Sequence, residues 1–254
     1  MSYPSEPVVE FANVSFRVDS RTLLNELNFA IHSGETLMLL GRSGSGKTTS
    51  LKLINRLLVP SEGEVRVEGK STTQWDVVKL RRHIGYAIQD VGLFPHYTVE
   101  QNVAVIPKLE GWPRERVAAR VQEVLQIVGL PSREFLKRYP NQLSGGQRQR
   151  VGLARALAAD PPILLMDEPF GALDPITRAE IQREFKALQQ RLQKTIVFVT
   201  HDVGEALLLG SRIALMESGN LHGIYTPREF VHSGDAEVKP YIDAFRATQQ
   251  ILSA

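Results

Sequence analysis

The segment that most constrains this chain is glycine-rich and reads Gly41-Arg42-Ser43-Gly44-Ser45-Gly46-Lys47-Thr48-Thr49. It fits the pattern G-x-x-x-x-G-K-S/T and follows the apolar run 36–40, which predicts a buried strand. Glycines let the backbone wrap closely around phosphate oxygens, and the helix that follows directs its N–H groups and positive end at the anion. A strand, a glycine-rich turn and a helix in this order predict a phosphate-binding loop.

Two side chains of this loop carry specific chemistry. Lys47 supplies a positive charge for the β- and γ-phosphates, and the Thr48 hydroxyl is placed to coordinate Mg²⁺. The alternative is a turn whose lysine is merely solvated, and it is disfavoured because strand, loop and helix arrive in the required order. The loop therefore predicts a nucleoside triphosphate and Mg²⁺ as ligands.

Composition excludes several classes of protein. The chain has 254 residues, enough for a full core in one large domain or two small ones. Lys and Arg number 30 against 28 Asp and Glu, a net charge of +2 that gives no electrostatic case for nucleic acid or an anionic membrane. Because there is no cysteine, disulfides, thiolate nucleophiles and Cys-ligated metals are excluded.

No segment is expected to cross a membrane. Residues 1–6 lack the basic stretch and apolar run of a signal peptide. The longest apolar candidate, 195–216, is interrupted by His201, Asp202, Glu205 and Arg212. A spanning helix needs about 20 apolar residues, so this segment does not qualify.

The order of expected strands and helices indicates an α/β fold. Strands are predicted at 8–16, 27–31, 64–68, 84–89, 163–166, 195–200 and 212–216, with 64–68 as an edge strand, and a helix is predicted from Gly46 to Leu58. Strands alternating with helices predict a mostly parallel sheet covered on both faces. The helical block 90–159 sits inside that alternation and is interpreted as an inserted subdomain; one of its helices opens at Pro113 and closes at Gly129.

Two carboxylates follow a second buried strand. Asp167 and Glu168 come directly after the apolar run 163–166. Ligands bind at the carboxyl ends of strands in parallel sheets, so Asp167 is placed to hold Mg²⁺ and Glu168 to polarise an attacking water. A helix cap before Pro169 is the alternative, and the phosphate loop makes it the weaker one.

A second helix start with small residues follows Leu143. Ser144-Gly145-Gly146-Gln147 combines a natural N-cap with an apolar helical pattern from Val151 to Ala158. Free N–H donors and the helix dipole would make it a second anion site. Taken alone, a simple capped helix is the favoured interpretation.

Together these motifs resemble the ATP-binding subunits of ABC transporters over nearly the whole chain. The loop 41–49 is similar to Walker A, 163–168 to Walker B with its catalytic glutamate, and 143–147 to the family signature. Gln89 stands where the family has its Q-loop glutamine, 171–174 looks like the D-loop, and His201 looks like the switch histidine. All six occur in the family's order and spacing.

The resemblance implies roles for these residues. The catalytic set would be Lys47, Gln89, Glu168 and His201, and Thr48, Gln89 and Asp167 would ligate Mg²⁺. Within one subunit, ATP would contact the whole loop 41–49, Gln89 and His201. In a head-to-tail dimer, the same ATP would also contact the signature and D-loop residues of the second subunit, which are Ser144, Gly145, Gly146, Gln147 and Asp174. One departure concerns adenine: the family stacks it on an aromatic residue, whereas this chain has Val18 there, with Phe16 two residues away.

The implied architecture is one ABC ATPase domain over residues 1–254. It is a P-loop NTPase fold with a RecA-like mostly parallel sheet (about 1–89 and 160–224), an antiparallel β part on the N-terminal side, an inserted helical subdomain (about 90–159) and a short helical tail (about 225–254). Some family members carry two regulatory domains at this end, and a tail of about 30 residues is too short for one. A short unregulated relative and a different amine, amino-acid or lipid system both stay open.

The stretch 84–103, with 105–112, is similar to importer ATPases for glycine betaine, choline or carnitine. The resemblance implies membrane permease subunits, an extracytoplasmic substrate-binding protein and a peripheral location at the cytoplasmic face of the membrane. Four apolar residues after Gln89 are candidates for binding a cytoplasmic helix of the permease: Val91, Leu93, Phe94 and Tyr97. The alternative is that they pack within the helical subdomain. An exporter module remains an alternative, while a soluble ABC ATPase lacks support because there is neither a coiled-coil insertion nor a second ATPase core.

Overall fold

The computed structural model describes residues 6–88, 91–171 and 173–253. The chain divides into two compact units, one formed by the chain up to Val77 with everything from Thr195 onward, the other by Val78–Lys194. This division differs from the boundaries predicted for the core and the helical subdomain, because β6, β7 and α8 belong to the same unit as the helical segment. The predicted boundaries stay a prediction about the family's architecture.

The first unit begins with an antiparallel sheet in the strand order β2-β1-β4-β5. Its strands are β1 (Val9–Val18), β2 (Arg21–Ile31), β4 (Glu62–Val67) and β5 (Lys70–Ser71). Phe11 and Phe29 pair across β1 and β2 with stacked rings 4.3 Å apart. The prediction of an edge strand at 64–68 was wrong, since β4 lies between β1 and the two-residue β5 that the glycine-bounded turn leads into.

The first unit also holds strands in the order β10-β9-β3-β8. They are β3 (Thr36–Leu40), β8 (Thr195–Thr200), β9 (Arg212–Glu217) and β10 (Asn220–Tyr225). β3 pairs in parallel with both β8 and β9, and β10 closes antiparallel on β9. Every residue of β3 and β8 is buried, which is typical of the strands of a parallel sheet.

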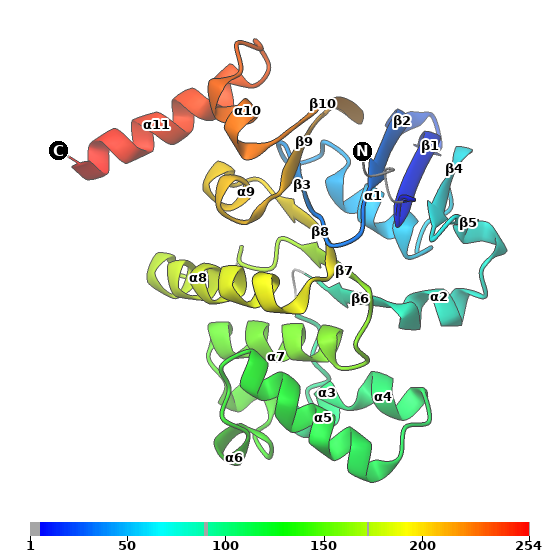
Figure 1. Ribbon diagram of the computed structural model, residues 1–254, viewed down its shortest axis with the longest axis vertical. Coiled ribbons are helices and arrows are strands. Elements are labelled where there is room, and N and C mark those ends of the chain that lie inside the picture. The colour runs from blue at the N-terminus through cyan, green and yellow to red at the C-terminus, as the bar shows by residue number, and fades with distance from the viewer. Residues whose placement is uncertain (1–5, 89–90, 172, 254) are drawn as a thin grey trace. The chain divides into compact units, whose positions relative to one another are not determined.

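Three helices of the first unit, α1 (Lys47–Ile54), α9 (Val203–Leu209) and α10 (Pro227–His232), lie against strands, whereas α11 (Lys239–Ser253) packs on α9 (Figure 1). A 3₁₀ helix lies at Thr72–Gln74. The predicted extension of α1 to Leu58 was wrong. Asn55 ends the helix, its side chain accepts a hydrogen bond from the backbone N–H of Leu57, and Arg56 takes a left-handed φ of 53°.

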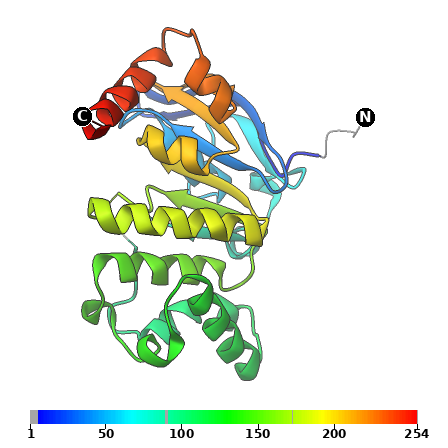
Figure 2. The same ribbon diagram turned by 60° about the vertical axis from the view of Figure 1, so that its left-hand side comes forward.

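The second unit pairs two parallel strands, β6 (Ile84–Ala87) and β7 (Ile163–Asp167), and is otherwise helical. Figure 2 shows its helices in colours that run from cyan at α2 through green to yellow at α8. They are α2 (Val77–His83), α3 (Val99–Val103), α4 (Val105–Leu109), α5 (Arg114–Ile127), α6 (Ser132–Phe135), α7 (Gly145–Leu157) and α8 (Pro175–Leu192), with a 3₁₀ helix at Pro140–Gln142. The predicted helix after Pro113 is confirmed as α5, with Val117, Val121 and Val124 buried on one face.

The α/β class is confirmed, with parallel strands, a separate antiparallel sheet and a helical segment. Among the described residues, no helix has both the length and the apolar character that crossing a bilayer requires.

Candidate nucleotide site

The phosphate loop connects β3 to α1 in the first unit. Gly41 follows the last residue of β3, and Gly46 stands at the N-cap of α1 with a left-handed φ of 99° and no side-chain hydrogen bond to the helix. Arg42, Ser43 and Gly44 are exposed. No side chain caps this helix start, and the backbone N–H groups at a helix N-terminus are the donors that an anion site uses.

Lys47 lies back across its own loop. Its ammonium donates hydrogen bonds to the carbonyl oxygens of Gly41 and Arg42, both at 2.8 Å, and the side chain is buried. A buried ammonium needs such partners, since desolvation without them costs several kcal/mol. The loop thereby holds a fixed positive charge beside its exposed backbone.

Two glycines of the loop leave no room for a side chain. A Cβ at Gly41 would collide with the carbonyl oxygen of Met216 on β9, and one at Gly46 would collide with the side chain of Leu24 on β2. The turn after β9 also reaches the loop, since Gly219 donates its N–H to the carbonyl of Ser45 at 3.2 Å. Close approach by two strands fixes the loop conformation before any ligand arrives.

His201 leaves the sheet beside the phosphate loop. Leu40 at the end of β3 pairs with Thr200 at the end of β8, so Gly41 and His201 follow paired residues of adjacent parallel strands. Thr200 fixes this turn: its hydroxyl donates to Glu205 at 2.5 Å and accepts the N–H of Asp202 at 2.9 Å. His201 is exposed at the carboxyl edge of the strands, where ligands of parallel sheets bind.

Asp167 and Glu168 leave β7 in the second unit. Asp167 is the last residue of β7 and is 6% exposed. Glu168 has a left-handed φ of 43°, a strained conformation for a non-glycine residue of the kind that clusters at functional sites. The helix-cap alternative for this pair was wrong, because Asp174 caps α8 by accepting the N–H of Thr177.

The signature segment forms the start of α7. Ser144 is the N-cap: its hydroxyl accepts the N–H of Gln147 at 3.2 Å, and the Gln147 side-chain oxygen accepts the N–H of Ser144 at 3.0 Å. This reciprocal capping box confirms the predicted N-cap. Gly145 has open space where a Cβ would stand, so the helix start can be approached closely.

Each unit brings together part of the predicted site. The first unit juxtaposes the ends of β3 and β8, with the loop 41–49 and His201; the second holds Asp167, Glu168, Ser144–Gln147 and Asp174. Gln89 lies outside the described residues. Within the described residues no cluster of three His, Asp or Glu side chains suits a metal ion. A site with few carboxylates suits Mg²⁺, because this ion binds one or two carboxylates and completes its coordination shell with water and phosphate oxygens.

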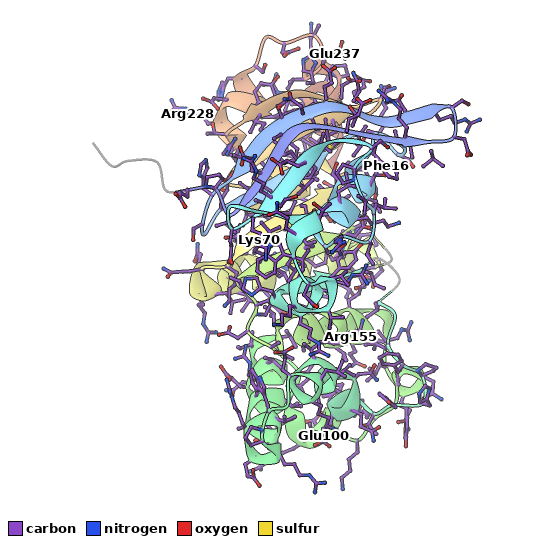
Figure 3. The ribbon with its side chains drawn as sticks, turned by 90° about the vertical axis from the view of Figure 1, so that its right-hand side faces the viewer. Phe16, Lys70, Glu100, Arg155, Arg228 and Glu237 are labelled. Carbon is purple, nitrogen blue, oxygen red and sulfur yellow. The ribbon has the colours of Figure 1, made fainter. Side chains whose placement is uncertain are left out.

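The position where an adenine-stacking aromatic is expected carries none. Val18 ends β1 and is 46% exposed, whereas Phe16, labelled in Figure 3, is 9% exposed and pairs with Leu24 inside the sheet. Phe16 therefore belongs to the core and is not placed to receive a base.

Sequence reasoning missed two polar residues that shape the segment after β6, the buried Asn102 and the partly buried Arg155. Asn102 accepts the N–H of Phe94 and donates to the carbonyls of Phe94, Tyr97 and Thr98 at 3.0–3.1 Å. Arg155, labelled in Figure 3, donates to the carbonyls of Val91 and Gly92, and burial lowers its pKa. An asparagine inside an apolar helix pattern was the available signal for the first.

Comparison with known proteins agrees with this geometry. Residues 24–171 match the family model described as ABC transporter, so the chain belongs to the ABC transporter family of ATP-binding proteins. Two curated relatives are the glycine betaine/carnitine/choline transport ATP-binding protein OpuCA of Bacillus subtilis, 47% identical over 91% of this chain, and the osmoprotectant import ATP-binding protein OsmV of Salmonella typhimurium, 50% identical over 82%. The chain spans 60% and 54% of the length of these two relatives.

A solved structure shares the fold. The ATP-binding cassette MJ0796, in a dimeric post-hydrolysis state bound to ADP and phosphate, is 37% identical with a TM-score of 0.77 over 87% of this chain and 99% of its own. The expected fold, a P-loop cassette with a parallel sheet and an antiparallel β part, is therefore confirmed.

Proposed function

We propose that this chain is the ATP-hydrolysing subunit of an ABC importer for quaternary amines and related osmoprotectants. The observation that carries the proposal is the phosphate loop, where a helix start without a side-chain cap and the fixed ammonium of Lys47 offer one anion site. The substrate class is supported by OpuCA and OsmV, whose names give betaine, carnitine, choline and osmoprotectants as cargo.

Each predicted residue takes a role in this proposal. The loop 41–49 binds the phosphates of ATP, with Lys47 neutralising their charge. Thr48, Gln89 and Asp167 hold Mg²⁺, which supplies charge neutralisation on the phosphate oxygens when bound. Glu168 accepts a proton from the attacking water, and His201 contacts the γ-phosphate.

We propose a head-to-tail pair of ATPase subunits as the working form. Ser144–Gln147 and Asp174 of one subunit then close on the nucleotide that the partner's loop holds, expelling water from the site. The dimeric state of MJ0796 supports this arrangement. ATP and Mg²⁺ together would then be needed for a complete site.

Exchange of the general base tests the hydrolytic role. Glu168→Gln keeps shape and hydrogen bonding but loses basicity, so turnover should fall by about 10²–10⁴-fold while ATP binding persists. Light scattering should show the variant shifting from monomer to dimer when MgATP is added. Turnover at the parent's rate would exclude Glu168 as the base.

The transport role depends on the segment after β6. Phe94 and Tyr97 are 42% and 37% exposed, their rings lie 5.2 Å apart, and the buried Asn102 donates to the backbone carbonyls of both. Arg155 holds the preceding carbonyls of Val91 and Gly92. Val91 and Leu93 are only partly exposed, and Val91 packs against Gly152. Aromatic side chains displayed on a fixed backbone suit a short amphipathic helix of a permease.

Phe94→Asp tests this docking surface. The variant should keep the basal ATPase of the isolated subunit and lose co-purification with the permease subunits. His96→Asp is the matched control, because it adds the same charge beside the pair at an exposed position. Loss of ATPase together with assembly would assign Phe94 to the core of its unit, and unchanged assembly would place the docking surface elsewhere. A permease that exports its substrate would favour the exporter alternative.

The exposed aliphatic Val18 leads us to propose weak base selectivity. With valine in place of an aromatic residue at this position, the base loses a stacking interaction of about 1–3 kcal/mol. GTP should then compete with ATP within about one order of magnitude in a displacement titration.

A further inference from the structure

Tyr86 and Asp167 occupy the same face of the β6–β7 pair. Tyr86 pairs with Leu165 in register, and Asp167 stands two residues beyond Leu165. Because side chains alternate along a strand, Tyr86, Leu165 and Asp167 point to one side, with Tyr86 diagonal to Asp167. The Tyr86 hydroxyl lies 3.5 Å from Oδ2 of Asp167.

The contact joins a buried carboxylate to a neutral donor. Asp167 is 6% exposed and Tyr86 is partly buried. A phenol has an ordinary pKa near 10 and carries its proton at neutral pH, so the Tyr86 hydroxyl donates and the carboxylate accepts. The separation is longer than the 2.5–2.7 Å of a strong hydrogen bond to a carboxylate, and contacts of this kind tighten when a site is loaded.

Orientation is the property that such a donor controls. A carboxylate at the end of a strand can rotate about its terminal torsion, which is broad and nearly two-fold. A hydroxyl beside one oxygen restricts that rotation, and carboxylates that hold metals through one or two oxygens depend on such partners.

We propose that Tyr86 is a positioning residue for Asp167, fixing the orientation in which this carboxylate receives Mg²⁺. This inference rests on the proposed function, in which Asp167 holds the metal. Tyr86 does not touch nucleotide or metal in this role; it acts through Asp167 alone.

The hydroxyl can be removed without removing the ring. Tyr86→Phe keeps the packing of β6 and deletes only the donor. Tyr225→Phe is the matched control, because the Tyr225 hydroxyl also donates to an aspartate, Asp235 at 2.9 Å, in the other unit. Asp167→Asn is the reference for a lost metal ligand.

The measurement is the Mg²⁺ dependence of nucleotide affinity. A fluorescent non-hydrolysable ATP analogue is titrated at a series of Mg²⁺ concentrations and in EDTA, and thermal unfolding is recorded in parallel. Tyr86→Phe should raise the half-saturating Mg²⁺ concentration by about 10-fold, the low end for loss of an outer-shell partner. Its affinity in EDTA and its Tm should stay at the parent's values, and Tyr225→Phe should leave the Mg²⁺ dependence unchanged.

Other results overturn the proposal. An unchanged Mg²⁺ dependence in Tyr86→Phe, or an equal weakening with and without metal, would assign the hydroxyl to packing. A parent protein that binds the analogue with no response to Mg²⁺ would overturn the metal role of Asp167 and the positioning role with it. If the nucleotide affinity of the parent depends on Mg²⁺ and that of Tyr86→Phe depends on it equally, only the positioning role of Tyr86 is overturned.

Discussion

The N-termini of α1 and α7, the two helices predicted to contact nucleotide, are capped in opposite ways. At α1, Gly46 caps with a left-handed backbone and no side-chain bond, and Lys47 follows at once. At α7, Ser144 and Gln147 exchange hydrogen bonds, so two of the backbone donors are already satisfied. A helix start that lacks a cap leaves its donors to a ligand, whereas a capped start is stable by itself.

This contrast suggests different roles for the two helix starts: α1 binds the nucleotide, and α7 completes the nucleotide site of a second subunit. The α1 start has no side-chain cap and holds the Lys47 ammonium at its own loop in a single chain, so we expect it to bind phosphate unaided. The α7 start is capped and carries no lysine in its first turn, so it should add little to the affinity of one chain. We expect it to act only when a second subunit brings nucleotide to it. Four experiments test this difference between the two helix starts.

The largest loss of nucleotide affinity is expected from substitution of Lys47. Lys47→Ala removes the charge held against Gly41 and Arg42, and nucleotide affinity should fall by at least about 100-fold, since hydrogen bonds to charged groups contribute 1.5–3 kcal/mol each. Lys52→Ala, at the other end of α1, is the matched control. The readout is equilibrium binding of a fluorescent ATP analogue. Normal affinity in a folded Lys47→Ala protein would refute the phosphate-loop assignment.

Gly46 should show the next largest effect. Gly46→Ala combines left-handed strain with a collision against Leu24, so stability should drop by about 1–3 kcal/mol and nucleotide affinity should fall with it. Gly34→Ala isolates the strain, because Gly34 has a φ of 73° but open space around a Cβ. Chemical denaturation and binding titration are compared for both. If Gly34→Ala weakens nucleotide binding equally, the loop geometry is not the cause.

Ser144 should matter across the dimer. In a mixed dimer, a Ser144→Arg chain paired with a Lys47→Ala chain places both lesions in one site and leaves the other intact. Nucleotide occupancy should then be one per dimer. Two damaged sites would indicate that Ser144 serves the nucleotide of its own chain, and the contrast between the two helix starts would be lost.

The smallest effect is expected from removing the cap alone. Ser144→Ala should cost about 1 kcal/mol of stability, because one backbone donor loses its partner. Thr226→Ala is the matched control, since Thr226 forms the same capping box at α10. Both should lose similar stability in urea titrations, but only Ser144→Ala should reduce ATPase. A lower single-chain affinity in Ser144→Ala would mean that α7 contributes to binding before closure.

The local motifs of the sequence were sufficient for much of the site. The spacing of Gly41, Gly46 and Lys47 predicted a loop between a buried strand and a helix, and the structure has that order. Ser144 ahead of an apolar helical pattern predicted an N-cap, which forms. Such features depend on backbone conformation within a few residues, so short patterns encode them.

Residues that act over long sequence separation escaped prediction. Arg155 holds carbonyls 63 and 64 residues away, and Tyr86 meets Asp167 at a separation of 81. The fate of Phe16 was equally undetermined by its neighbours, because its burial depends on pairing with Leu24. A local sequence pattern does not predict which distant polar group a side chain will hydrogen-bond.

From the sequence it was possible to predict the turn between β3 and α1, the carboxylates at the end of β7 and the alternation of strands and helices, because each follows from local periodicity and turn chemistry. Tertiary structure decided where α1 ends, which strand lies at the sheet edge, and that Gly41 and His201 follow paired strand ends. It also decided which aromatic residues are buried. These properties depend on strand register and on packing between segments far apart in the chain, which the linear pattern does not specify.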